Sequence, residues 1–125
     1  MIDDAAKIAT VHAYVDGFAR ADSEAIADLF AADATVEDPV GTPIRRGKVE
    51  ILKFYAFSVT TGAKLELLGA PRCAGDSVAF PFAVKLHHEG AAMVIQVIDI
   101  FRFDDAGKIA EMRAFWGPGN VNPGR

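Results

Sequence analysis

Apolar residues in the first half of the chain recur at the spacing of helix faces. After acidic residues that suit a helix start, four of them share one face of a predicted first helix: Ile8, Val11, Val15 and Phe18. Asp22 and Ser23 offer a cap for a short second helix, which is predicted to bury Ile26, Leu29 and Phe30. A third helix is predicted over residues 48–58, with its inward side at Ile51, Leu52 and Tyr55.

A short strand is predicted between the second and third helices, and it ends at Asp38. Thr35 and Val36 favour extended backbone, and Pro39 disfavours the helical region for the residue before it. Side chains alternate along a strand, so Val36 and Asp38 share one side and Glu37 takes the other. Asp38 is therefore expected in extended structure just before a turn.

The second half of the chain alternates with a period of two, which is typical of strands. Apolar residues occupy alternate positions over residues 80–86, and a long strand is predicted over residues 91–103 after a turn at Glu89 and Gly90. A turn at residues 104–107 leads to a last strand with four inward residues: Ala110, Met112, Ala114 and Trp116. Residues 117–125 are predicted to be a loose tail, and Pro81 marks a sheet edge or a bulge. Helices followed by strands predict an α+β fold, a bent mixed or antiparallel sheet with three helices on its concave face.

Composition limits the classes of protein to which the chain can belong. Its 125 residues fit one domain, residues 1–125, and 51% hydrophobic residues allow a real core. The net charge is −4 without a basic stripe, which argues against a nucleic-acid partner. The sequence contains no run of about 18 apolar residues, the length that a membrane-spanning helix requires. One cysteine, Cys73, and three scattered histidines show no metal-ligand spacing. We expect a cytoplasmic protein that binds neither nucleic acid nor membrane.

The candidate chemistry starts from Asp99, a carboxylate at an apolar position. In the strand over residues 91–103 every odd position is apolar except Asp99, whereas the even positions include Gln96 and Arg102. Desolvation on an apolar face raises the pKa of a carboxyl, so Asp99 is expected to stay protonated and to act as a hydrogen-bond donor. Such a donor can stabilise negative charge that develops on a substrate oxygen. The pattern also allows a structural role, in which Asp99 pairs with a buried arginine or caps a loop.

Two further residues favour catalysis over a structural role. Asp38 shares a side with Val36 beside a turn, and Tyr14 lies at the edge of the apolar face of the first helix. A base, an acid and a phenol are the groups that proton abstraction beside a carbonyl requires. Taken alone, Asp38 before a proline can simply form a turn, and Tyr14 can be a core aromatic residue.

Three segments closely resemble the bacterial Δ5-3-ketosteroid isomerases: residues 32–39 (ADATVEDP), residues 97–103 (VIDIFRF) and residues 112–116 (MRAFW). The resemblance covers nearly the whole chain. It implies a cone-shaped fold of the nuclear-transport-factor-2-like superfamily with a deep apolar pocket, a homodimer, and no cofactor or metal. These isomerases are themselves a known case of a carboxylic acid that stays neutral in order to donate a hydrogen bond.

The resemblance also implies roles for individual residues. Asp38 corresponds to the general base, and Tyr14 and Asp99 correspond to the two donors of the oxyanion hole. Tyr55 resembles the tyrosine that supports the first phenol, and Trp116 resembles the aromatic residue that shields the base. The residues implied to line or support the steroid site are Phe54, Phe82, Phe101 and Met112. Some members of the family carry a further tyrosine where this chain has Phe30, so the phenol network is expected to stop at Tyr55.

The implied reaction converts a Δ5-3-ketosteroid to its Δ4 isomer by proton abstraction, dienolate stabilisation and reprotonation. Two alternatives remain open at the level of sequence, since one fold hosts many functions. The first is a non-catalytic module of the same fold that binds a small ligand. The second is a related hydrolase or cyclase, in which an Asp-Arg-Asp arrangement activates water. For the second we find no strong candidate for a buried arginine, because Arg102 and Arg113 fall on the wetter faces of their strands.

Overall fold

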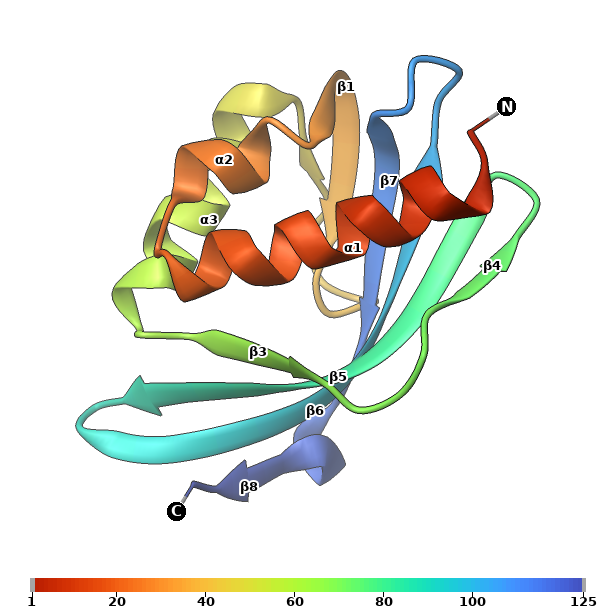
Figure 1. Cartoon of the computed structure of the whole chain (residues 1–125). Coiled ribbons are helices and arrows are strands. Elements are labelled where there is room, and N and C mark those ends of the chain that lie inside the picture. Colours follow the sequence, from red (N-terminus) through yellow and green to blue (C-terminus); the bar gives the residue numbers. More distant parts are fainter. Residues whose placement is uncertain (1, 125) are drawn as a thin grey trace.

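Three helices cover the concave face of a strongly curved sheet in the computed structural model, which describes residues 2–124 (Figure 1). The helices are α1 (Asp4–Ala19), α2 (Ser23–Ala27) and α3 (Lys48–Thr60). The strands are β1 (Phe30–Glu37), β2 (Arg45–Arg46), β3 (Lys64–Leu67), β4 (Arg72–Ala74), β5 (Ser77–His88), β6 (Ala91–Phe103), β7 (Ile109–Phe115) and β8 (Val121–Pro123). The predicted α+β fold is confirmed. None of the helices in residues 2–124 is long and apolar enough to cross a membrane.

The strands form one mixed sheet in the order β2-β1-β7-β6-β5-β3. Strands β1 and β7 are parallel, and the other pairs are antiparallel. Strands β5 and β6 form a long hairpin that turns at Glu89 and Gly90, where φ is +51° and +80°. Pro81 lies on β5 between the stretches that pair with β3 and β4, so its missing N–H falls where the outer edge of β5 has no ladder partner.

The buried face of α1 is rotated from the one predicted. Ile8 and Val15 are only half-buried, whereas Tyr14 and Lys7 are fully buried with Val11 and Phe18. Tyrosine and lysine have large apolar bodies behind their polar tips, so they can join a buried face that apolar residues alone do not define. The Lys7 ammonium donates to the carbonyl of Gly75 at 2.7 Å. Tyr14 therefore lies at the centre of the packed face and not at its edge.

Two boundaries also differ from the predicted ones. Phe30 does not belong to the second helix; it begins β1 beside Ile109 of β7 and is buried there. Ile109, and not Ala110, is the inward residue at the start of β7, because the register between β6 and β7 shifts after Arg102. An extra residue in one strand changes which positions face inward, and alternation alone does not reveal it.

The prediction of a loose tail over residues 117–125 is wrong for the residues that the structure describes. Residues Pro118–Asn120 form a 3-10 turn, and β8 then pairs with Met93, Val94 and Ile95 of β6. Strand β6 is longer than β7, so its first half has ladder positions that β8 fills. Residue 125 lies outside the described residues.

Candidate active site

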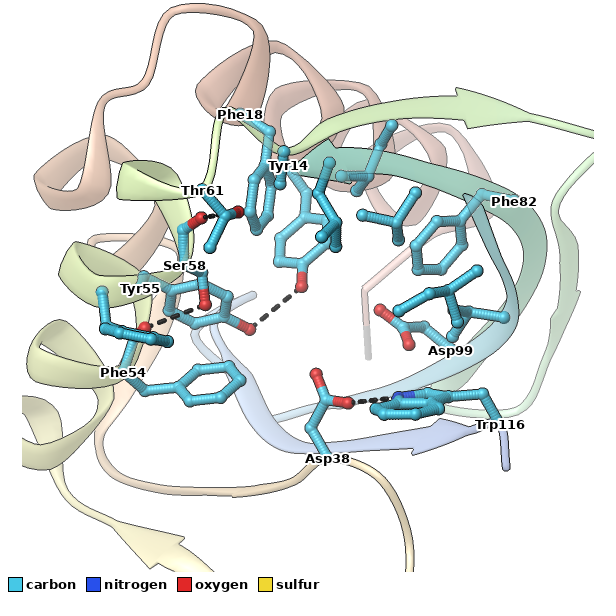
Figure 2. Close-up of a pocket in the computed structure, with 17 residues that line it drawn as sticks. Tyr14, Phe18, Asp38, Phe54, Tyr55, Ser58, Thr61, Phe82, Asp99 and Trp116 are labelled. Atoms are coloured by element: carbon cyan, nitrogen blue, oxygen red, sulfur yellow. Dashed lines mark hydrogen bonds between the residues drawn. The ribbon is translucent and has the colours of Figure 1, made fainter. Parts of the chain in front are cut away.

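A cavity of about 230 Å³ opens between α1, α3 and the concave face of the sheet. Its lining is apolar except for six residues: Tyr14, Asp38, Tyr55, Ser58, Thr61 and Asp99. Figure 2 shows that the carboxyl groups of Asp38 and Asp99 and the hydroxyl of Tyr14 point into the same space from different walls. The three candidates for chemistry, which are distant in the sequence, are therefore brought together.

Asp99 reaches the cavity from the middle of β6. It lies between Phe80 of β5 and Ala114 of β7 in the sheet, and its side chain is on the buried face with Val97 and Phe101. The residue is 1% exposed, and neither carboxyl oxygen has a hydrogen-bond partner among the described residues. Burial raises the pKa of Asp99 well above its ordinary value, and the negative charge of Asp38 raises it further. Its surroundings therefore favour the protonated form of Asp99, and a protonated carboxyl is able to donate a hydrogen bond.

Tyr14 of α1 and Tyr55 of α3 share a buried hydrogen bond, with their hydroxyl oxygens 3.0 Å apart. Edge-to-face contacts with Phe18 and Phe101, at ring-centroid distances of 5.2 Å and 5.1 Å, hold the Tyr14 ring. Burial raises the pKa of both phenols well above the ordinary value. Both stay protonated, so when Tyr55 donates to Tyr14 the Tyr14 proton is free to point into the cavity.

Asp38 follows β1 directly and lies at the opposite wall. The Trp116 indole N–H donates to Oδ1 of Asp38 at 2.8 Å, and the N–H of Val40 donates to the carbonyl of Ala114 at 2.8 Å, which anchors the turn after Asp38 to β7. Burial raises the pKa of Asp38, whereas the Trp116 hydrogen bond and the positive charge of Arg45 lower it. The pKa of Asp38 is therefore raised, but Trp116 and Arg45 offset part of the effect of burial, whereas no group offsets it for Asp99.

Most of the residues singled out from the sequence line this cavity. Tyr14, Asp38 and Asp99 do so, together with four others: Phe54, Tyr55, Phe82 and Trp116. Phe101 and Met112 are fully buried and are not among the lining residues. Phe101 packs edge-to-face against the Tyr14 ring, with 5.1 Å between the ring centroids.

Two groups of residues at the site were not predicted from the sequence. The first lies at the end of α3, where Ser58 and Thr61 reach the cavity and Phe57 stands exposed at its rim. Helix α3 continues to Thr60, two residues beyond the predicted end. The second is Arg45 of β2, whose Nη1 is buried without a partner among the described residues. Arg45 is half-buried, whereas only Arg102 and Arg113 were considered from the sequence as possible arginines of the site. The sequence could not predict that Arg45 faces α3, because β2 has only two residues and shows no alternation.

Comparisons with known proteins agree on the fold and differ over the reaction. A family model described as the SnoaL-like domain matches residues 11–112. A steroid Delta-isomerase from Nocardioides simplex is 41% identical over 113 residues, which cover 90% of this chain and 91% of that protein. A solved structure of SalBIII, described as an epoxide hydrolase/cyclase-like enzyme with a role in pyran ring formation in the polyether salinomycin, has a TM-score of 0.93 and 29% identity. That likeness covers 98% of this chain and 99% of the SalBIII chain.

Proposed function

The chain belongs to the SnoaL-like domain family, in the nuclear-transport-factor-2-like superfamily that includes the steroid Delta-isomerases, and from this premise we propose that it converts Δ5-3-ketosteroids to Δ4-3-ketosteroids. The observation that carries the proposal is the contrast between two carboxyl groups in one cavity. Asp38 has a hydrogen-bond donor in Trp116 and a nearby cation in Arg45, whereas both oxygens of Asp99 have no partner among the described residues. A base and a neutral acid are thus available at the same pH.

In the proposed mechanism Asp38 removes a proton from the carbon between the ketone and the alkene. The electron pair moves onto the ketone oxygen, and a dienolate results. Tyr14 and protonated Asp99 donate hydrogen bonds to that oxygen, and Tyr55 supports Tyr14 by donating to it. Asp38 then returns the proton two carbons further along, which leaves the double bond conjugated with the ketone. Donors fixed in an apolar cavity stabilise the developing charge without reorganisation during the reaction.

The test is an ultraviolet assay with 5-androstene-3,17-dione, in which the conjugated enone product absorbs. We expect the protein to form the enone and Asp38→Asn to lose most of its turnover, since an amide cannot accept the proton. Asp33→Asn is the matched control, because Asp33 is an exposed carboxylate on the same strand β1. Circular dichroism establishes that both variants fold. Unimpaired turnover by folded Asp38→Asn would exclude Asp38 as the base.

A second candidate function is the opening of an epoxide, by hydrolysis or cyclisation. The likeness to SalBIII favours it, as does an arginine beside Asp38 with a buried and unpartnered Nη1. The same protein preparation is therefore incubated with a small epoxide, and diol formation is followed. Diol without enone would replace the isomerase proposal with this one. Enone without diol, and without activity in Asp38→Asn, would support the isomerase. Binding of the steroid without either product would indicate a non-catalytic ligand-binding module.

We also propose that the chain forms a homodimer through the sheet face opposite the helices. Three large apolar side chains are exposed around a hollow on that face: Leu68, Ile98 and Phe115. Ile98 and Asp99 are neighbours on β6 and point to opposite faces, so Ile98 does not line the cavity, although Val97 and Trp116 border both the cavity and this hollow. Apolar patches of this kind support a protein partner, and a second copy fits what the family resemblance implies. Light scattering on a sizing column measures the mass, and a monomer at micromolar concentration would refute the proposal.

A further inference from the structure

The guanidinium of Arg45 is held against the inside of the protein, unlike that of an ordinary surface arginine. In the antiparallel pair β1–β2, Arg45 lies opposite Val36, which is fully buried and precedes Asp38 by two residues on the same side of the strand. The guanidinium carbon lies 4.3 Å from the centroid of the Phe54 ring on α3. Its Nη1 is buried, and no described residue accepts a hydrogen bond from it. The next residue, Arg46, is exposed to solvent.

This arrangement places a positive charge behind the wall of the cavity. Phe54 lines the cavity and Arg45 does not, so the guanidinium stacks on the ring from outside the lining. A buried N–H without a partner destabilises the fold, and a guanidinium on a half-buried strand could turn outward to avoid that cost. The stack on the aromatic face compensates only in part. We therefore expect the positive charge of Arg45 to have a second favourable interaction that helps to keep the side chain inside.

We propose that Arg45 is a positioning residue for the base, whose fixed charge favours the carboxylate form of Asp38 and whose stack on Phe54 keeps that charge in place. This inference rests on the proposed function only where its test measures turnover; the titration of Asp38 described below does not depend on that function. Arg45 touches no substrate in this scheme. It acts through Asp38, and through the aromatic ring between itself and the cavity.

Among the groups around Asp38, Arg45 is the one that supplies a positive charge. Tyr14 from α1 and Tyr55 from α3 are neutral phenols, and Asp99 from β6 is a neutral acid, since burial raises the pKa of all three. Trp116, after β7, donates one hydrogen bond to Asp38. Burial raises the pKa of Asp38, and of the charges nearby it is Arg45 that lowers it. Arg113 of β7 is directed to Glu37, with 3.4 Å between its Nε and Oε1 of that carboxylate.

Removing the charge should therefore make the base titrate at higher pH. The rate constant kcat/KM requires ionised Asp38 in the free protein, so its acid limb reports the pKa of that group. In Arg45→Gln we expect the acid limb to move to higher pH, with a plateau at alkaline pH close to that of the unmodified protein. Arg45→Lys keeps a charge on a flexible stem and should restore most of the shift. Arg46→Gln, on the same strand and exposed, is the matched control and should leave the profile unchanged.

A purely structural role predicts a different result. If Arg45 only packs against Phe54, then Arg45→Gln lowers kcat/KM by the same factor at every pH and the acid limb stays in place. That outcome would overturn the proposal, as would an equal shift in the Arg46→Gln control. If Arg45→Gln does not fold by circular dichroism, Arg45→Met gives the same comparison, because its unbranched stem still covers the Phe54 ring.

A second readout separates this inference from the proposed function. The Asp38 carboxyl is titrated by nuclear magnetic resonance in protein that carries ¹³C-labelled aspartate, with Asp38→Asn to assign its signal. The midpoint should rise in Arg45→Gln relative to the unmodified protein, whether or not any steroid is turned over. An unmoved midpoint refutes the role of Arg45. Absence of turnover with a raised midpoint refutes the isomerase and leaves the role of Arg45 supported.

Discussion

Replacing Asp99 with leucine should weaken catalysis and strengthen the fold at the same time. The leucine side chain cannot donate a hydrogen bond, so the dienolate oxygen keeps only the Tyr14 donor. Loss of one such donor lowers kcat by about 10²–10³, or about 3 kcal/mol of transition-state stabilisation. Asp99→Asn is the matched control, because its amide is neutral, of the same size, and still a donor. We expect kcat of Asp99→Asn to lie well above that of Asp99→Leu.

The stability gain follows from the two unpartnered oxygens. Asp99 is 1% exposed and its carboxyl finds no hydrogen bond among the described residues. A buried polar group in that state costs about 1–3 kcal/mol, and an apolar replacement removes the cost. Leucine has as many side-chain heavy atoms as aspartate, and its two methyl groups, slightly larger than the oxygens they replace, can extend into the cavity of about 230 Å³ without displacing the core. Below about pH 4, where Asp99 is protonated in both states, we expect the free energy of unfolding to rise by about 1 kcal/mol, with Tm higher by roughly 4 °C.

The gain should also depend on pH, and its direction tests whether Asp99 is neutral. In the unfolded chain Asp99 ionises above about pH 4, whereas in the native protein burial raises its pKa and it keeps its proton. The native state then binds more protons than the unfolded state, so the unmodified protein loses stability as pH rises through this window. Asp99→Leu has no such group. The difference in unfolding free energy between the two proteins should widen by about 1.4 kcal/mol per pH unit while native Asp99 stays protonated.

Urea unfolding at pH 5 and at pH 7, with kcat at saturating steroid, measures all three effects. Asp38 is present in both proteins, so its own titration largely cancels from the comparison. An unchanged kcat in Asp99→Leu would refute the role of Asp99 as a donor. A stability difference that is equal at pH 5 and pH 7 would show that native Asp99 is already ionised, and the pairing of a base with a neutral acid would then be wrong.

Two further predictions concern the phenol pair and the outer sheet face. Tyr55→Phe removes the 3.0 Å hydrogen bond to Tyr14 and leaves a buried hydroxyl oxygen without that partner, so the free energy of unfolding should fall by about 1–3 kcal/mol and kcat should drop by less than in Asp99→Leu. Equal kcat for Tyr55→Phe and the unmodified protein would exclude support of Tyr14 through this bond. Ile98→Glu places a charge on the proposed dimer face, and the mass measured by light scattering should shift to that of a monomer. The steroid assay checks that the active site of this variant is intact. A dimer that persists in Ile98→Glu would show that the interface lies elsewhere.

The faces of the long strands were determined by the sequence alone. Alternation along β6 separates the buried positions of Val97, Asp99 and Phe101 from the exposed positions of Gln96 and Arg102, and the structure confirms this separation. The same local rule placed Asp38 beside Val36 at the end of β1. A strand has a period of two whatever it packs against, so these assignments needed no knowledge of the rest of the chain. The identity of Asp99 as an unusual carboxylate followed from its face.

Other features were decided only by tertiary structure, because they depend on segments that are distant in sequence. Whether Asp38 meets Asp99 and Tyr14 in one cavity depends on the curvature of the sheet and on the placement of α1 and α3 against it. Strand β8 pairs with β6 because β6 is longer than β7, which no local pattern in the tail indicates. No local pattern distinguishes Arg45, and its place over Phe54 follows only from the pairing of β2 with β1 and from the packing of α3. Periodicity reports the environment of one segment, whereas the ionisation of Asp38 and Asp99 is decided by charges and burial that other segments supply.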